Sequence, residues 1–185
     1  MVNRAFFLDR DGVINVDHGY ISHPSQFDFI SGVFDACRQI VHGGYQIIIV
    51  TNQSGIGRGY YSEEAFNALT HWMIDAFNKE GINIADVRYC PHHPVHGVNS
   101  YLKDCHCRKP NPGMIIKAAN AHQIALNQSV LVGDKVSDMQ AGERAGIPFL
   151  YKVGEDNGPS QDTHNWKQCH RLRDAVADFF SNQPQ

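Results

Sequence analysis

Ala5-Phe6-Phe7-Leu8-Asp9-Arg10-Asp11-Gly12 is the stretch of sequence from which the fold can be worked out. Its first four residues are apolar and predict a short strand that is buried on both faces. Two carboxylates, Asp9 and Asp11, follow where that strand ends, and Gly12 then turns the chain. Carboxylates at the carboxyl end of a strand face the crevice in which open α/β sheets bind ligands. Such a pair can divide its work between a nucleophile and a proton carrier.

The composition is that of an ordinary globular protein. The chain has 185 residues, 42% of them hydrophobic, and a formal net charge of −3. This predicts a single domain over residues 1–185, without a nucleic-acid or membrane surface. No apolar stretch approaches the roughly 18 residues of a membrane helix, and the first strand leaves no room for a signal peptide. We therefore expect a cytoplasmic, monomeric enzyme.

Apolar runs and helical periodicities alternate along the chain. The predicted strands are residues 5–8, 45–50, 87–89, 129–132 and 147–151, and the predicted helices are 32–42, 62–79, 111–121, 137–145 and 172–180. Ser62 is expected to cap its helix, and Asn111 to cap the next one. Residues 154–168 are predicted to form a polar loop. This order indicates an α/β fold, a doubly wound parallel sheet with helices on both faces and no separate cap domain.

Polar residues recur where these elements meet. Asp9, Thr51 and Asp134 each occupy the first or second position after a predicted strand, so a parallel sheet brings all three to one edge. The pair Arg108-Lys109 precedes a predicted helix and supplies two cations. Taken singly, each feature is typical of a turn, a helix cap or a solvated surface pair. Their joint occurrence in this order predicts a site that binds a phosphate.

The set Asp9-x-Asp11, Thr51, Lys109 and Asp134 resembles the four motifs of the haloacid dehalogenase (HAD) superfamily of phosphotransferases. The resemblance extends from Asp9 to about Asp138. It implies a doubly wound parallel sheet and hydrolysis of phosphate esters through an aspartyl-phosphate. No Gly-x-x-x-x-Gly-Lys-Ser/Thr loop occurs, which argues against kinase chemistry.

The resemblance also implies a role for each motif residue. Asp9 would be the nucleophile, and Asp11 would protonate the leaving oxygen and later accept a proton from water. Thr51 and Lys109 would hold the phosphoryl oxygens. Asp134, with the Asp9 carboxylate and the Asp11 carbonyl, would bind Mg²⁺, which suits an all-oxygen site. Asp138 would orient the waters of that metal.

Substrate contacts are expected from the loops that surround these motifs. Arg108 or Lys135 would bind a second phosphate, because an arginine fork suits phosphate recognition. The predicted substrate-binding residues are Asp17, His18, Gly19, Tyr20, Asn52, Gln53, Ser54, Arg108 and Lys135. No role can be assigned to Gly57 or to residues 154–168.

Three of the five cysteines lie within one aperiodic loop, residues 90–107. Cys90-x-His92 and Cys105-x-Cys107 supply three thiols and one imidazole, the donor set of a structural zinc site. His93, His96 and His106 are competing ligands, and reactive or merely buried thiols are the simpler alternative. We expect a zinc ion that fixes the neighbouring cations Arg108 and Lys109. Cys37 and Cys169 are expected only to pack.

Within the superfamily, this loop resembles that of a small group of capless phosphatases acting on heptose bisphosphates or on histidinol phosphate. Asp17-His18-Gly19-Tyr20, Cys107-Arg108-Lys109-Pro110 and Gly133-Asp134-Lys135 are closer to the heptose group. The chain also lacks the Glu-Pro-Pro stretch of the histidinol-phosphate group. The resemblance implies removal of the 7-phosphate of a heptose 1,7-bisphosphate in lipopolysaccharide synthesis. The alternatives are histidinol phosphate, another small sugar phosphate, or a non-catalytic zinc-stabilised binding protein.

Overall fold

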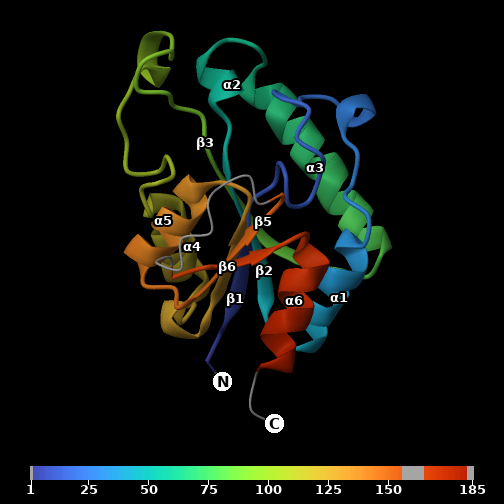
Figure 1. The fold of residues 1–185 in the computed structure, drawn as a ribbon. Helices are drawn as coiled ribbons and strands as arrows, with labels where there is room; N and C mark the ends of the chain where they lie inside the picture. The colour runs from blue at the N-terminus through green and yellow to red at the C-terminus, as the bar shows by residue number, and fades with distance from the viewer. Residues whose placement is uncertain (1, 156–164, 183–185) are drawn as a thin grey trace.

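A six-stranded parallel sheet forms the centre of the protein (Figure 1). The computed structural model describes residues 2–155 and 165–182. The strand order is β3-β2-β1-β4-β5-β6, so consecutive strands are laid down outward from β1 in both directions. The strands are β1 (Ala5–Leu8), β2 (Gln46–Asn52), β3 (Ile84–Cys90), β4 (Val130–Gly133), β5 (Phe149–Val153) and β6 (Lys167–Cys169). This is the predicted doubly wound α/β architecture.

Helices cover both faces of the sheet. They are α1 (Val33–His42), α2 (Ser54–Gly57), α3 (Glu63–Lys79), α4 (Gly113–His122), α5 (Val136–Ala145) and α6 (Leu172–Ser181). Phe6 and Leu8 point into a core shared with α1, α3 and α6, whereas Phe7 points into a second core shared with α4 and α5. Because side chains alternate along a strand, the apolar run of β1 stabilises both layers at once.

The sheet places the functional residues at one end of the molecule. In Figure 1 the strands run upward, and both termini lie at the bottom. The chain segments that follow β1, β2 and β4 therefore meet at the top, near α2 and the loop after β3. This is the edge at which doubly wound sheets bind their ligands.

Two strands extend further than their sequences predict. β2 continues through Thr51 and Asn52, which pair with Tyr89 and Cys90 of a β3 that begins as early as Ile84. The polar residues of β3 weaken its apolar pattern, but the hydrogen bonds of the neighbouring strand satisfy its backbone. As a result Thr51 is held within β2. Cys90, the first of the predicted zinc ligands, is the last residue of β3.

One of the two predicted helix caps is present in the structure. The Ser62 side chain accepts a hydrogen bond from the Ala65 N–H at 3.2 Å, as expected for an N-cap. The prediction for Asn111 was wrong, because Pro112 is the N-cap residue of α4. The Asn111 amide instead donates to the Cys105 carbonyl at 2.9 Å. Asn111 therefore fastens the cysteine-rich loop to the start of α4.

Helix α2 and strand β6 are among the short elements that were not predicted. Helix α2 lies in the segment expected to be a loop after β2. β6 begins at the end of the segment 154–168, of which residues 156–164 are outside the described range. Both elements are too short to show a periodicity, and β6 is defined only by its pairing with β5. Within the described residues, no helix has the length and apolar character needed to cross a membrane.

Candidate active site and metal centres

A buried lysine connects two carboxylates at the carboxyl edge of the sheet. Lys109 Nζ lies 3.0 Å from Asp9 Oδ1 and 2.7 Å from Asp138 Oδ1, and it donates to the Val50 carbonyl at 2.8 Å. The Arg10 N–H donates to Asp9 Oδ1 at 2.8 Å. Only 6% of Asp9 is exposed to solvent, and 3% of Lys109. The two residues are thus fixed relative to β1 and β2 before any ligand binds.

The electrostatics of this corner favour a bound cation. The pKa of Asp9 is raised to about 8: burial is the largest cause, Lys109 opposes it, and Asp138, Asp134 and Asp11 add to the rise. Burial also raises the pKa of Asp134. Burial acts to lower the pKa of Lys109, but Asp138 and Asp9 together raise it above its ordinary value. One lysine faces several acids, so an additional positive charge would stabilise their ionised forms.

The carboxylates of Asp9, Asp134 and Asp138 form a group that can hold a metal. One oxygen from each lies within 4.8 Å of the others. Asp134 Oδ1 is buried and has no hydrogen-bond partner among the described residues. Gly12, at φ +84°, lets the chain pass so close that a Cβ there would lie 2.5 Å from Asp134 Oδ2. The donor set consists of oxygens, which fits Mg²⁺.

Asp138 contacts the residues of the site directly, whereas the sequence predicted only that it would orient the waters of the metal. Its Oδ2 accepts the Lys135 N–H at 2.9 Å and so caps the start of α5, while its Oδ1 pairs with Lys109. Gly133 permits this approach, since a Cβ there would lie 2.3 Å from the Asp138 Cβ. Asp138 therefore orients Lys109 as well as lying beside the candidate metal ligands.

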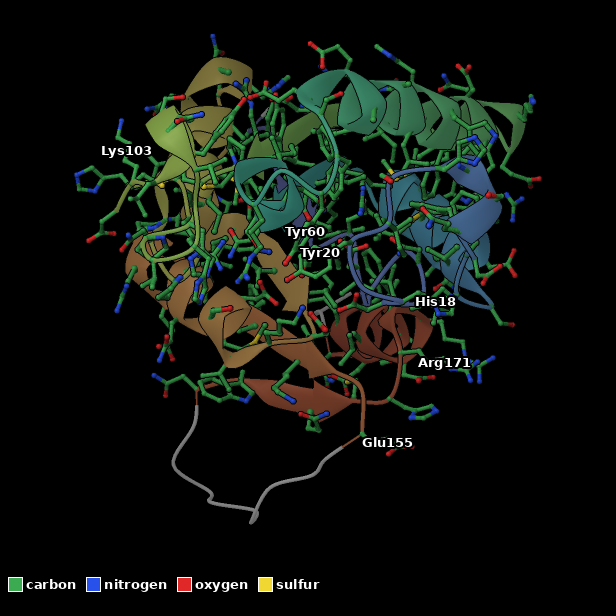
Figure 2. All side chains as sticks on the ribbon, turned by 90° about the horizontal axis from the view of Figure 1, so that it is seen from above. His18, Tyr20, Tyr60, Lys103, Glu155 and Arg171 are labelled. Atoms are coloured by element: carbon green, nitrogen blue, oxygen red, sulfur yellow. The ribbon has the colours of Figure 1, made fainter. Side chains whose placement is uncertain are left out.

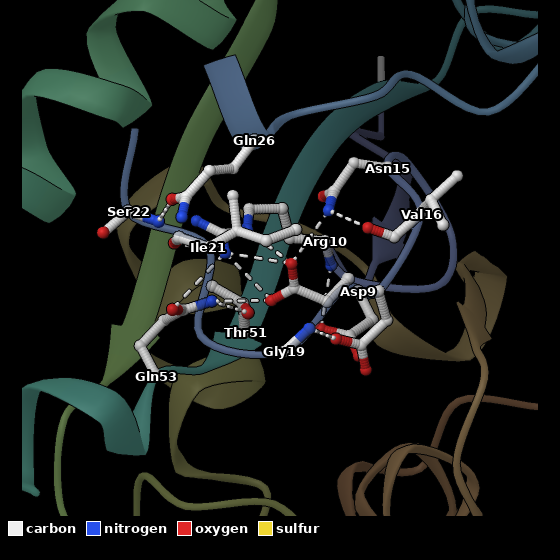
Figure 3. A network of polar contacts seen from close by, with 12 residues as sticks. Asp9, Arg10, Asn15, Val16, Gly19, Ile21, Ser22, Gln26, Thr51 and Gln53 are labelled. Atoms are coloured by element: carbon white, nitrogen blue, oxygen red, sulfur yellow. Dashed lines mark hydrogen bonds and ion pairs between the residues drawn. The ribbon is translucent and has the colours of Figure 1, made fainter. Parts of the chain in front are cut away.

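The Asp11 carboxylate points to a different set of partners. Arg10 donates to it from Nε at 3.2 Å and from Nη2 at 2.9 Å, Asn15 donates at 3.0 Å, and Gln53 donates at 2.9 Å (Figure 3). Both Arg10 and Asn15 are buried. Asp9 and Asp11 thus lie in distinct environments, which is what a division between nucleophile and proton carrier requires.

A cavity of about 580 Å³ opens beside these groups. It is lined by Asp11, Asp17, Gly19, Tyr20, Asn52, Gln53, Ser54, Gly55, Tyr61, Arg108, Lys109, Pro110, Lys135 and Ser137. Eight of the nine predicted substrate-binding residues are in this set. Lys135 Nζ lies 3.3 Å from Asp17 Oδ2 across the opening.

His18 is the predicted substrate residue that the structure does not bring to the cavity. Its Nε2 lies 2.8 Å from Asp28 Oδ2, on an exposed part of the same loop. Figure 2 shows His18 well to the side of Tyr20 and Tyr60, whose rings pack edge to face at 4.6 Å. Adjacent residues in a loop point in different directions, so Gly19 and Tyr20 reach the cavity whereas His18 does not.

Asn52 connects the sheet to the segment that carries the cations. Its amide donates to the Lys109 carbonyl at 3.1 Å and accepts the Lys109 N–H at 3.0 Å. Arg108 instead donates to the His92 carbonyl at 3.2 Å. Lys109 is therefore supported by β2, and Arg108 by the cysteine-rich loop.

The structure brings together the four predicted zinc ligands, Cys90, His92, Cys105 and Cys107. The sulfur atoms lie 3.0 to 3.5 Å apart, and His92 Nδ1 lies 3.3 Å from Cys107 Sγ. Zinc bonds to sulfur measure about 2.3 Å, so one ion can reach all four atoms. The contacts with Cys90, Cys105 and His92 lower the pKa of Cys107 to about 5 although burial opposes this, which favours the thiolate that zinc binds.

The competing histidines take other places. His93 Nδ1 accepts the N–H groups of Val95 and His96, at 3.1 and 2.9 Å, and so shapes the loop rather than joining the thiols. Among the described residues, neither His96 nor His106 belongs to the cluster. Cys37 is buried in the core, and burial raises the pKa of its thiol to about 12.

Gly57, which had no predicted role, forms the contact between α2 and the zinc loop. A Cβ at this position would lie 2.3 Å from the Pro91 carbonyl oxygen and 3.1 Å from the Tyr101 Cβ. The Gly57 carbonyl accepts the Val98 N–H at 2.8 Å. Only a glycine allows the two backbones to approach this closely.

Arg10, Asn15 and Tyr61 were not predicted to have a role. Arg10 and Asn15 belong to the first motif, so their proximity to Asp11 was a usable signal. Tyr61 reaches Gln53 Oε1 at 2.5 Å from beyond the end of α2. No local pattern marks that contact, because it depends on how the chain returns after α2.

Comparison with known proteins agrees with this geometry. The model of the HAD-hydrolase-like family matches residues 106–177. The D-glycero-beta-D-manno-heptose-1,7-bisphosphate 7-phosphatase of Vibrio cholerae is 50% identical over 157 residues, 84% of each chain. The D-glycero-alpha-D-manno-heptose-1,7-bisphosphate 7-phosphatase of Burkholderia mallei is 51% identical over 147 residues, 80% of this chain and 78% of that protein.

A solved structure has the same fold over nearly the whole chain. The D,D-heptose 1,7-bisphosphate phosphatase from B. bronchiseptica, complexed with magnesium and phosphate, superposes with a TM-score of 0.84 at 27% identity, covering 97% of this chain and 99% of that one. The parallel sheet and its edge of carboxylates and lysine define a HAD-like hydrolase. Within that class, the chain belongs to the same family as the heptose-1,7-bisphosphate 7-phosphatases.

Proposed function

We propose that the protein removes the 7-phosphate of D-glycero-D-manno-heptose 1,7-bisphosphate. The observation that carries the proposal is the combination of this family membership with a polar cavity in which Asp11, Lys109 and Arg108 converge. The reaction would supply heptose 1-phosphate for nucleotide activation. We expect the protein to act in the cytoplasm as a monomer on this small sugar phosphate.

In the first step, an Asp9 carboxylate oxygen attacks phosphorus, and the bond from phosphorus to the sugar oxygen breaks. Asp11 gives its proton to that oxygen, so the sugar leaves as an alcohol. Two negative unit charges 4 Å apart repel by about 4 kcal/mol at an effective dielectric constant of 20, so the attack needs compensating charge. Lys109 supplies one positive charge at the nucleophile, at 3.0 Å from Asp9 Oδ1.

In the second step, Asp11 accepts a proton from water, whose oxygen attacks the phosphorus of the aspartyl-phosphate. The bond from phosphorus to the Asp9 oxygen breaks, which releases phosphate and restores the carboxylate. The Thr51 hydroxyl and Lys109 would stabilise the phosphoryl oxygens throughout. Asp9 and Asp134 would hold Mg²⁺, which, when bound, neutralises charge on the phosphoryl group.

The second phosphate needs cations outside the reaction centre. Arg108 and Lys135 line the cavity and are suited to bind it. Arg108 receives its orientation from the His92 carbonyl, so the zinc loop would contribute to substrate binding as well as to stability. The hydroxyl groups of the sugar would contact the polar residues at the cavity wall.

Phosphate release measured with Mg²⁺ tests the proposal. The substrates to compare are the α and β anomers of D-glycero-D-manno-heptose 1,7-bisphosphate, the corresponding heptose 7-phosphate, and histidinol phosphate. We expect the highest kcat/KM with one bisphosphate anomer, and a higher KM without the 1-phosphate. Preference for histidinol phosphate would overturn the substrate assignment. Absence of turnover on every phosphate ester would favour a non-catalytic zinc-stabilised protein.

A further inference from the structure

The Gln53 side chain connects two groups of the proposed reaction centre. Its Nε2 donates to Asp11 Oδ2 and to Thr51 Oγ1, each at 2.9 Å (Figure 3). Gln53 is buried, with 3% of its surface exposed. A single amide nitrogen therefore contacts both the proton carrier and the hydroxyl that would hold the phosphate.

Tyr61 determines which way this amide points. The Tyr61 hydroxyl donates to Gln53 Oε1 at 2.5 Å, and Arg10 Nη2 lies 3.5 Å from the same oxygen. Burial raises the pKa of Tyr61 to about 12, so the phenol stays a donor at neutral pH. A flipped amide would direct Oε1 at the Asp11 carboxylate and leave the Tyr61 hydroxyl without its acceptor, which is costly in a buried site.

The amide also fixes the direction of the Thr51 hydroxyl. Thr51 is buried, and its oxygen accepts the Gln53 N–H. A hydroxyl has one hydrogen, and accepting from Gln53 leaves that hydrogen free to donate elsewhere. The donor of Thr51 is then available to a phosphoryl oxygen when substrate enters the cavity.

The other partners of Asp11 do not bond to Thr51. Arg10 and Asn15 both hold the carboxylate from the same loop that carries it. Gln53, in contrast, comes from the end of β2, where Thr51 also lies, and Tyr61 follows α2. Among these partners, Gln53 is the one that spans the two strand ends.

We propose that Gln53 and Tyr61 act as a positioning pair. Tyr61 fixes the orientation of the Gln53 amide, and this amide holds the Asp11 carboxylate and the Thr51 hydroxyl in fixed positions relative to each other. This adds a second role to Gln53, which is also predicted to bind substrate and lines the cavity. The inference rests on the proposed function for the roles of Asp11 and Thr51. The pair would affect turnover through Asp11 and Thr51, in addition to lining the cavity.

A double-mutant cycle tests the pair. We expect Gln53→Leu to lower kcat by about tenfold or more, because misplaced acid–base groups lose much of their effect, while KM stays within about twofold. Tyr61→Phe should lower kcat in the same direction but less. If Tyr61 acts through Gln53, the double variant should be no slower than Gln53→Leu alone.

Tyr89→Phe is the matched control. Its hydroxyl donates to Glu63 at 2.8 Å and does not line the cavity, so kcat should be unchanged. Gln53→Glu is the second variant, since it keeps the shape of the side chain but removes the N–H donor. We expect it to lose at least as much activity as Gln53→Leu, with a melting temperature that shows a folded protein.

Three results would contradict the proposal that Gln53 and Tyr61 act as a positioning pair. These are a raised KM with unchanged kcat in Gln53→Leu, additive losses of kcat in the double variant, and wild-type kcat in Gln53→Glu. The cycle is measured on the heptose bisphosphate and on para-nitrophenyl phosphate. Turnover of the second ester alone would reject the proposed substrate and still test the pair. Turnover of neither would reject both proposals.

Discussion

The carboxylate site and the zinc loop are built in opposite ways. Asp9 and Asp134 follow strands whose register is fixed by hydrogen bonds and by two apolar cores. Residues 90–107 have little regular structure beyond a short 3-10 helix at Asn99–Tyr101, and their thiols and imidazole converge on one point. The sheet positions the first site before any ion binds, whereas the second has little secondary structure and would gain stability from a bound ion.

The two regions meet at Arg108 and Lys109. Asn52 holds both the N–H and the carbonyl of Lys109, and so ties it to β2. Arg108 is held by the His92 carbonyl within the zinc loop. Neighbouring residues thus depend on different regions, and substitutions can separate the contribution of the sheet from that of the loop.

The largest expected effect is that of Asp9→Asn on the sheet-built site. The amide keeps the shape of the side chain but is not a nucleophile, so kcat should fall by about 10⁴-fold or more. Phosphate release gives the rate, and the melting temperature should remain near that of the wild type. Turnover within tenfold of the wild type would contradict the assignment of Asp9.

Lys109→Met acts on the junction between the regions. It removes a charge that pairs with Asp9 and Asp138, at 3.0 and 2.7 Å, and leaves both acids buried. We expect kcat to fall by about 10²–10³-fold and the free energy of unfolding to fall by about 3–5 kcal/mol. Urea denaturation measures the second quantity. An unfolding energy equal to that of Arg108→Met, which breaks no such pair, would contradict this result.

The variant Cys105→Ser distinguishes the contribution of the zinc loop to substrate binding from that of the sheet. The variant should lose zinc, and Arg108 should lose its orientation while Lys109 keeps that given by Asn52. We therefore expect KM for the bisphosphate to rise by about tenfold with a smaller change in kcat. Metal analysis and phosphate release are measured together, with Cys169→Ser as the control that retains zinc. A Cys105→Ser protein without zinc but with wild-type KM and stability would contradict a role for the loop.

The smallest expected effect is that of His18→Ala. His18 pairs with Asp28 on the surface, and exposed pairs of this kind contribute little. We expect kcat/KM to stay within about twofold of the wild type, whereas Lys135→Ala, on the cavity wall, should raise KM. A large loss in His18→Ala would show that its loop changes conformation when substrate binds.

Much of the fold follows from local patterns. The alternation of strands and helices indicated the doubly wound sheet, and β1 has the predicted bounds at Ala5–Leu8. The ends of β2 and β3 were less predictable, because their outer residues are polar and are recruited by each other. Helix α2 and strand β6 are too short to have a pattern of their own.

The functional site, like the fold, was predictable from the sequence only in part. The zinc ligands were identified from residue type and spacing, and the roles of Asp9, Asp134 and Lys109 from the resemblance to the superfamily motifs. The structure brings each group together. His18 was placed by its position in a motif, which does not determine the direction of a side chain. Gln53 was predicted to bind substrate and it lines the cavity, but its bonds to Asp11 and Thr51 were not foreseen.

The sequence by itself determined the parallel sheet, its functional edge and the two kinds of ligand set. These depend on the period of apolar residues, the order of the elements and the chemistry of Asp, Cys, His and Lys. Only the tertiary structure decided which partners each side chain has: Lys109 with Asp9 and Asp138, and Gln53 with Tyr61. Those contacts join residues that lie in different segments of the chain. They form when both faces of the sheet are packed and buried polar groups find hydrogen-bond partners.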